Sequence, residues 1–274
     1  MKLYRFEKFD AKRVDSLRRG SVWMSTPDQF NDPFDCKLKT YTESMMAVFT
    51  TDSYREAVKG LYKNASDYLN DWPSLTWVYN KKILDRIFKW MEAEQFDSFL
   101  YKDAVNEILD HIRNFRMTCF IDGSPNDTIM WSHYAANHSG FCVEYEVDEK
   151  LIDTDSDGTF YISPVVYSSR LPEFDTMEML LTPSEFAMRY LLSKGINWAY
   201  EREYRLINFT EGSSQEVSLP AGIHPTAVYA GLRANKNTHE LECIASELGL
   251  DFYRIERHQY LSELKAVKAP PNTR

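Results

Sequence analysis

The stretch MTCFIDGSPNDTIMWSHYAANHSGFCVEYEV, from Met117 to Val147, shows how this chain mixes its secondary structure. Its apolar beginning, Met117 to Ile121, predicts a strand. Asp127 is a favourable N-cap, and a short helix is expected from there through Ala136. The run Phe141 to Val147 predicts a second strand, so strands and a helix follow one another here within a few residues.

The N-terminal part of the chain predicts two further strands with a helix between them. Leu3 to Phe6 is expected as a strand. The helix that follows has Asp10 as its N-cap and ends before Gly20, a common residue just past a helix. Ser21 to Ser25 predicts the second strand. The next ten residues, TPDQFNDPFD (Thr26 to Asp35), are rich in turn formers and are expected as a structured loop.

The part after Val147 continues the same mixture. The expected elements are a strand over 158–168, a helix from Thr182–Glu185 to about Lys194, a strand over Tyr200–Phe209, a strand over Thr226–Gly231, a helix over Asn237–Leu248 and a last strand over Asp251–Glu256. Since strands and helices do not alternate strictly, an α+β fold with a mixed, mainly antiparallel sheet is favoured over a doubly wound α/β fold.

Residues 41–115 differ in character from both flanks. Their apolar residues recur with helical spacing, which predicts an insertion of three or four helices. The chain is therefore expected to form a single domain, with a core from residues 1–40 and 116–268, the helical insertion over 41–115, and a tail over 269–274.

Composition excludes several classes of protein. The chain has 274 residues, of which 32 are Lys or Arg and 41 are Asp or Glu, so its formal net charge is −9. Such a chain lacks the basic footprint of a duplex nucleic-acid binder or of a protein that binds anionic membranes. No apolar run is long enough to cross a bilayer, and the N-terminus has no signal-peptide pattern.

The four cysteines, Cys36, Cys119, Cys142 and Cys243, form no CxxC pair. Cys119 and Cys142 stand in apolar runs and are expected as small buried residues. Cysteine use of this kind is typical of a reducing compartment, and we expect a cytoplasmic protein.

The segment WAYEREYRLI, Trp198 to Ile207, is the most informative for chemistry. On a strand, Glu201, Glu203 and Arg205 would share one face. A solvated sheet face, with Arg205 paired across strands, explains this pattern. An active-site face explains it as well, since paired carboxylates stabilise positive charge or transfer protons.

Two other segments concentrate polar and aromatic residues. MWSHYAANHSG places His133 and His138 five residues apart, which is the wrong spacing for a zinc pair on one helix face. The concentration of aromatic and polar residues in this segment is instead typical of a polar pocket lined by rings. In FNDPFD, the run Asn31-Asp32-Pro predicts a turn in which the Asn or Asp side chain bonds to the backbone. Alternatively, this loop brings Asp32 or Asp35 to a cleft, where a metal is one candidate ligand. Arg5 on the first strand either reaches the surface or grips a phosphate.

The segments LYRF, GSVWMSTPDQFNDPFD, MWSHYAANHSGFCVEYE and KGINWAYEREYRL occur in this order, and together they resemble the bacterial family called domain of unknown function 2971. The sequence resembles the ADP-ribosyltransferase group more distantly. Members of that group carry an Arg or His on a first strand, a Ser or Tyr on a later one, and a Glu late in the chain, in one clade as the second residue of E-x-E. The matching positions are Arg5, Ser25 and Glu203, with His133 or Tyr134 as the alternative middle residue.

This resemblance implies an enzyme that consumes NAD, a transferase or glycohydrolase with a fold of that type, and a role as a toxin or defence effector. Glu203 would stabilise the oxocarbenium charge, Arg5 would bind the pyrophosphate, and Glu201 would orient an acceptor or water. The expected site comprises Glu203, Glu201 and His133 as catalytic residues, and Arg5, Ser25, Trp23, Asn31, Asp32, Trp131, Tyr134, His138 and Arg205 as binding residues, with NAD as substrate and no metal.

Two alternatives remain from the sequence. One is a metal-dependent phosphodiesterase or nuclease that uses Asp32, Asp35, His133 and His138. The other is a ligand-binding or interaction protein without catalysis. The acceptor of any transferred group, a protein or a nucleic acid, and the oligomeric state are not indicated by the sequence, and no membrane partner is expected.

Overall fold

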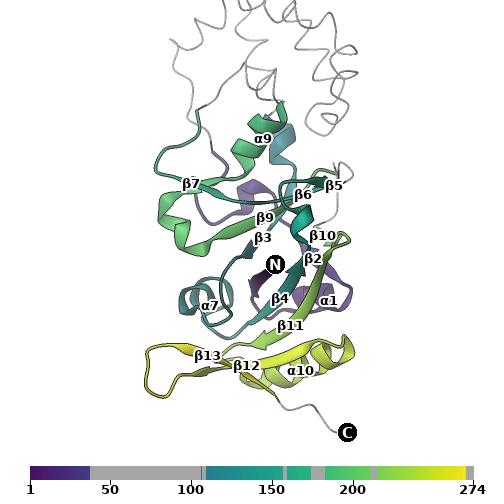
Figure 1. The fold of residues 1–274 in the computed structure, drawn as a ribbon, viewed down its shortest axis with the longest axis vertical. Helices are drawn as coiled ribbons and strands as arrows, with labels where there is room; N and C mark the ends of the chain where they lie inside the picture. Colours follow the sequence, from purple (N-terminus) through teal and green to yellow (C-terminus); the bar gives the residue numbers. More distant parts are fainter. Residues whose placement is uncertain (38–105, 107–108, 157–158, 174–182, 211–214, 270–274) are drawn as a thin grey trace, which may run out of the picture.

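The centre of the fold is a nine-stranded sheet in the order β13-β12-β11-β4-β1-β3-β9-β6-β5 (Figure 1). The structure is a computed structural model that describes residues 1–37, 106, 109–156, 159–173, 183–210 and 215–269. Most of the predicted helical insertion over 41–115 and nearly all of the predicted tail lie outside these residues. The division into core and insertion therefore stays a prediction, whereas the predicted α+β class with a mainly antiparallel sheet is confirmed.

The strands come from both ends of the chain. They are β1 (Lys2–Glu7), β2 (Ser21–Trp23), β3 (Arg116–Ile121), β4 (Phe141–Val147), β5 (Asp155–Ser156), β6 (Phe160–Pro164), β7 (Val166–Ser168), β8 (Ser193–Gly195), β9 (Glu203–Asn208), β10 (Glu216–Ser218), β11 (Ile223–Ala230), β12 (Asp251–Arg257) and β13 (Leu264–Lys268). Besides the large sheet, β10 pairs with β2, and β7 pairs with β8.

The helices are short. The α-helices are α1 (Ala11–Arg18), α7 (Thr128–Tyr134), α9 (Pro183–Leu191) and α10 (Thr238–Glu247), and the 3₁₀ turns are η1 (Pro27–Gln29), η3 (Glu149–Leu151), η4 (Ile196–Glu201) and η5 (Asn235–Asn237). Among the described residues, no helix has the length and hydrophobicity needed to cross a membrane.

The predicted caps are present at two helices. The Asp10 carboxylate accepts from the backbone N–H of Arg13, at 3.0 Å, and so begins α1. Asp127 accepts from the N–H groups of Ile129 and Met130, at 2.9 and 3.1 Å, and begins α7. Each cap satisfies backbone donors that the first helical turn leaves without a partner.

Helices cover both faces of the sheet (Figure 1). One face packs on α1 and α10 in a cluster that includes Leu3, Val14 and Leu241. The other face packs on α7 through Trp131, which is fully buried against Phe6. Alternate residues of each central strand enter the two clusters, as the two-residue period of a strand requires.

The largest difference from the sequence-based expectation concerns the segment from Tyr200. A strand was expected over Tyr200–Phe209, but β9 begins only at Glu203. The residues before it form η4, and Arg202 takes a left-handed conformation with φ of 46°. A left-handed residue reverses the chain direction locally and cannot continue a strand.

Three smaller expectations were also wrong. The strand expected over 158–168 is two strands, because the chain leaves β9 after Val165. Val165 N–H still donates to Glu203 O of β9, whereas Val166 N–H donates to Leu192 O. The helix expected to reach Lys194 ends at Leu191 and gives way to β8. Asp251–Glu256 is not the last strand, since β13 follows and pairs with it antiparallel.

We expect Gly140→Ala to destabilise the protein more than Gly20→Ala. A Cβ at residue 140 would lie 2.0 Å from the backbone oxygen of Glu7 and 3.1 Å from the Cα of Ala135, so strands must move. Gly20 has open space around it, and alanine there costs only the left-handed strain, about 1–2 kcal/mol. Urea unfolding of both variants measures the difference, and equal losses would show that β1 and β4 can separate freely at this point.

Candidate functional site

A cleft opens where two neighbouring strands of the large sheet separate. β1 pairs with β4 at every residue from Lys2 to Glu7, but with β3 only at Tyr4 opposite Ile121. β3 is in turn paired with β9 along its whole length. Beyond Tyr4 the two strands therefore diverge, and side chains from both faces of the sheet reach the gap between them.

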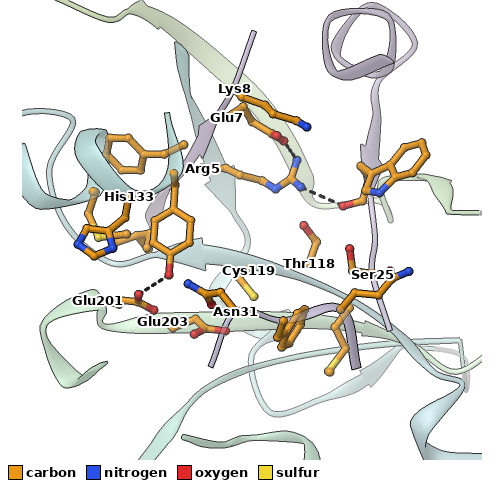
Figure 2. A pocket seen from close by; sticks show the side chains of 18 of the residues that line it. Arg5, Glu7, Lys8, Ser25, Asn31, Thr118, Cys119, His133, Glu201 and Glu203 are labelled. Carbon is orange, nitrogen blue, oxygen red and sulfur yellow. Dashed lines mark hydrogen bonds and ion pairs between the residues drawn. The ribbon is translucent and has the colours of Figure 1, made fainter. Parts of the chain in front are cut away.

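The cleft has a volume of about 370 Å³. Its lining comes from β1, α1, β2, the loop that follows β2, β3, α7, β8, η4 and β9 (Figure 2). The lining residues are Arg5, Phe6, Glu7, Lys8, Arg13, Trp23, Ser25, Gln29, Phe30, Asn31, Asp35, Met117, Thr118, Cys119, Ile121, Met130, His133, Tyr134, Lys194, Glu201 and Glu203.

One end of the cleft is basic. Arg5 donates to the Glu7 carboxylate through Nη1 and to the backbone oxygen of Trp23 through Nη2, the latter at 2.9 Å (Figure 2). Arg13 donates to the other Glu7 oxygen at 2.7 Å and also lies over the Trp23 ring. Lys8 adds a third cation whose side chain is 63% exposed. Three cations thus line this end with one carboxylate, Glu7.

The opposite end contains two carboxylates on one buried lysine. Lys194 Nζ donates to Glu201 Oε2 at 2.6 Å and to Glu203 Oε2 at 2.7 Å. All three side chains are at most 4% exposed. The second oxygen of Glu201 accepts from the Tyr134 hydroxyl, which comes from α7 (Figure 2).

A buried arginine lies below this pair. Arg205 Nε donates to Glu203 Oε1 at 2.7 Å, and Arg205 Nη2 donates to both oxygens of Asp35 at 2.8 and 2.7 Å. Its remaining nitrogen, Nη1, donates to the backbone oxygen of Leu191 and to Cys36 Sγ, the latter at 3.3 Å. The guanidinium is fully buried, and every one of its nitrogens has an acceptor. This satisfaction is what permits a charged group at such depth.

The two glutamates have different electrostatic surroundings. Glu203 contacts both Arg205 and Lys194, and these cations lower its pKa to about 2 although burial opposes them. Glu201 contacts only Lys194 and a phenol, so burial dominates and raises the pKa of its carboxyl. Two neighbouring carboxylates whose pKa values are pushed apart are a pattern typical of acid–base sites.

The convergence of the two glutamates was expected, but for the wrong reason. Strand alternation was expected to place Glu201 and Glu203 on one face. Glu201 instead belongs to η4, and the left-handed Arg202 turns it back towards Lys194. Two cations offset the repulsion between the glutamates: Arg205, which bonds to Glu203, and Lys194, which bonds to both and which the sequence interpretation did not single out.

Aromatic rings stand beside the acidic end. The His133 ring lies 6.1 Å from Tyr134, 6.3 Å from Trp198 and 6.4 Å from Tyr200, measured between ring centroids. Lys194 Nζ lies 5.1 Å from the centroid of the Trp198 ring. This wall offers flat surfaces to a planar ligand.

The structure brings most of the expected site residues to this one cleft. Those that line it are Arg5, Trp23, Ser25, Asn31, His133, Tyr134, Glu201 and Glu203. The four other expected residues, Arg205, Asp32, Trp131 and His138, do not line this cleft.

Arg205 lies beneath the cleft and acts on it through Glu203. Asp32 is buried in the loop after η1, where one oxygen accepts from Phe34 N–H. Trp131 is a core residue whose indole N–H donates to the Pro125 oxygen at 2.7 Å, so it cannot stack on a ligand. His138 bonds to Ser132 and lines a different cavity, of about 300 Å³, near Arg233.

The sequence interpretation missed Glu7, Lys8, Arg13 and Lys194. Lys194 belongs to the motif KGINWAYEREYRL, which also contains Glu201 and Glu203. A cation in the same motif as two carboxylates could have indicated an ion pair with them. Glu7 and Arg13 had no such signal, because their roles depend on how α1 folds back against β1.

Metal binding finds no ready-made site in the described part of the chain. No group of three or more His, Cys, Asp or Glu side chains is arranged there to hold an ion. Asp35, Glu201 and Glu203 are close together, but Arg205 and Lys194 already occupy their oxygens.

We expect Glu203→Gln to lower stability at neutral pH by about 3–5 kcal/mol, since it leaves two buried cations short of one partner. The difference from wild type should shrink as the pH falls from 4.5 towards 2. A carboxyl with a lowered pKa stabilises the fold above its unfolded value, and this contribution is lost as the folded protein binds the proton. Urea unfolding at several pH values measures it, with the exposed Glu263→Gln as control. A difference independent of pH would contradict the ionised state of Glu203.

Comparison with known proteins adds a family. No curated protein sequence and no solved structure matches the chain. The family model described as "Protein of unknown function (DUF2971)" matches residues 130–206. This stretch runs from α7 into β9 and contains Tyr134, Lys194, Glu201 and Glu203. The match agrees with the resemblance seen in the sequence: residues 130–206 of the chain are similar to the DUF2971 family.

Proposed function

We propose that this protein cleaves the nicotinamide–ribose bond of NAD and transfers the ADP-ribose to an acceptor or to water. The observation that carries the proposal is the charge distribution of the cleft. Cations stand at one end and two buried carboxylates at the other, within a single cavity of about 370 Å³. A ligand with an anionic middle and a sugar that becomes positive during reaction suits such a cavity.

The basic end would bind the pyrophosphate. Arg5, Lys8 and Arg13 line it, and Glu7 holds the two guanidinium groups in place. Planar guanidinium groups suit phosphate oxygens because they donate two parallel hydrogen bonds. The nearby Trp23 ring supplies a flat surface for a base.

The acidic end would hold the ribose next to nicotinamide. When the bond between the ribose carbon and the nicotinamide nitrogen breaks, its electron pair leaves with nicotinamide and positive charge develops on the sugar. Glu203 is ionised over the whole neutral range and can stabilise this charge. The rings of Tyr134 and His133 would support the nicotinamide.

The wider biological role is part of the proposal. We propose that the protein acts as a toxin or defence effector. It would do so by depleting the NAD of a cell or by attaching ADP-ribose to a protein or nucleic acid. We place it in the cytoplasm, since its four cysteines are free thiols. The resemblance to the ADP-ribosyltransferase group supports the same reading.

The two alternatives from the sequence fit the cleft less well. For a metal-dependent phosphodiesterase, a cation would have to displace Lys194 or Arg205 from the carboxylates. A binding protein without catalysis would use the same basic end, but it gives no reason for two carboxylates buried on one lysine.

The test is nicotinamide release from NAD by the full chain. If wild type is active, Glu203→Gln should lower kcat by about 10² to 10³, because the amide keeps the shape and loses the charge. Glu263→Gln, on an exposed hairpin, should leave the rate unchanged. Thermal melts separate loss of activity from loss of fold. No nicotinamide release by folded wild-type protein would refute the proposal.

We also expect Arg5→Lys to raise KM about tenfold with little change in kcat. Lysine keeps a positive charge next to Glu7 but has no planar fork for the pyrophosphate. Steady-state kinetics with NAD measure both constants. A fall in kcat at unchanged KM would contradict a binding role for Arg5.

A further inference from the structure

Among the residues that the structure describes, the acidic end of the cleft contains more carboxylates than cations. Asp35, Glu201 and Glu203 are each at most 2% exposed, and so are short of water to solvate their charge. The cations among them are Lys194 and Arg205, both buried. If all five groups were ionised, the cluster would carry one uncompensated negative charge in a buried place, which is costly.

Geometry shows which carboxylate is left short. Nη2 of Arg205 donates to both oxygens of Asp35, and Nε of Arg205 donates to Glu203. Lys194 gives Glu203 a second partner. Of the described cations, Glu201 contacts Lys194 alone, and it shares this lysine with Glu203.

The other groups that face Glu201 do not change this balance. They are the Tyr134 hydroxyl from α7, Glu203 from β9, and the rings of Tyr167 from β7 and Tyr200 from η4. Tyr134 and Lys194 favour the ionised form of Glu201, whereas burial and the charge of Glu203 favour the neutral form. Tyr167 donates to no carboxylate oxygen but accepts the backbone N–H of Glu203, at 2.9 Å.

We propose that Lys194 is the positioning residue of the cleft, and that Glu201 is the group in the cluster that takes up a proton. Lys194 is buried and holds both carboxylates in place. Glu201 shares this lysine, whereas Glu203 also contacts Arg205, so Glu201 is the less well compensated of the two. Glu203 then remains a permanent negative charge. The two carboxylates thus have separate roles, set by how many cations each one contacts.

In the proposed reaction, to which this part of the inference is tied, the ionised form of Glu201 acts as the base. The oxygen of the attacking hydroxyl bonds to the ribose carbon, nicotinamide leaves with the electron pair of the broken bond, and the hydroxyl proton goes to Glu201. A base whose pKa lies above that of an ordinary carboxylate is better matched to neutral pH. Tyr134, which bonds to Glu201 and lines the cleft, aligns the carboxylate for this transfer (Figure 2).

The test is a pH titration by NMR of the full chain with ¹³C-labelled glutamate carboxyls, which needs no turnover. Glu201→Gln and Glu203→Gln assign the two resonances, and Glu263→Gln is the matched control at an exposed site. In wild type, Glu201 should titrate at a higher pH than Glu203. In Lys194→Met the pKa of Glu201 should rise further, by about 1 to 3, because it loses its one cation. Glu203 should move less, since it keeps Arg205.

A merely structural role for Lys194 predicts the opposite sign. If the lysine only holds the segments together, its removal lets water reach Glu201, and the pKa of Glu201 falls towards its ordinary value. Either a fall or an unchanged pKa of Glu201 in Lys194→Met overturns the proposal.

Tyr134→Phe keeps the test decisive if Lys194→Met does not fold. It removes a donor to Glu201 without removing a charge, so the pKa of Glu201 should rise while that of Glu203 stays in place. No rise overturns the proposal. The titration also separates this inference from the proposed function, because a protein that releases no nicotinamide can still show the expected order of the two carboxyls.

Discussion

The interaction on which the site depends is the burial of the Arg205 guanidinium. It bonds to Glu203 on its own strand, to Asp35 in the loop after β2, and to the backbone end of α9. Three segments far apart in the sequence therefore meet at one charged group. A buried guanidinium that loses one of its acceptors destabilises the fold, because its charge is then uncompensated. Each of these segments therefore stabilises the position of the others.

The cleft itself follows from an incomplete strand pairing. A continuous sheet would have hydrogen bonds between β1 and β3 along their whole length and no space between them. Here the two strands pair at one position and then diverge, which exposes β1 side chains on one side and β3 and β9 side chains on the other. The cleft therefore lies in the middle of the sheet and not at its edge. Basic residues near β1 face acidic residues near β9 across it.

The glutamates of this cleft differ in how many cations each one contacts. Glu7, Glu201 and Glu203 are chemically identical, yet each meets a different set of cations. Glu7 holds two arginines, Glu203 an arginine and a lysine, and Glu201 part of one lysine. The pKa values of Glu203 and Glu201 are therefore shifted in opposite directions, although both residues are ordinary glutamates.

The sequence by itself determined many of the local elements. Apolar periodicity and the caps Asp10 and Asp127 predict helices and strands because these signals act within a few residues. The motifs also indicated the resemblance to the DUF2971 family, and eight of the twelve expected site residues line the cleft. Only the tertiary structure decided how these residues meet. Lys194 reaches Glu201 because a left-handed Arg202 turns the chain, and Trp131 leaves the site because its helix packs it against Phe6. Such contacts depend on the positions of whole elements, and no pattern within a single segment specifies them.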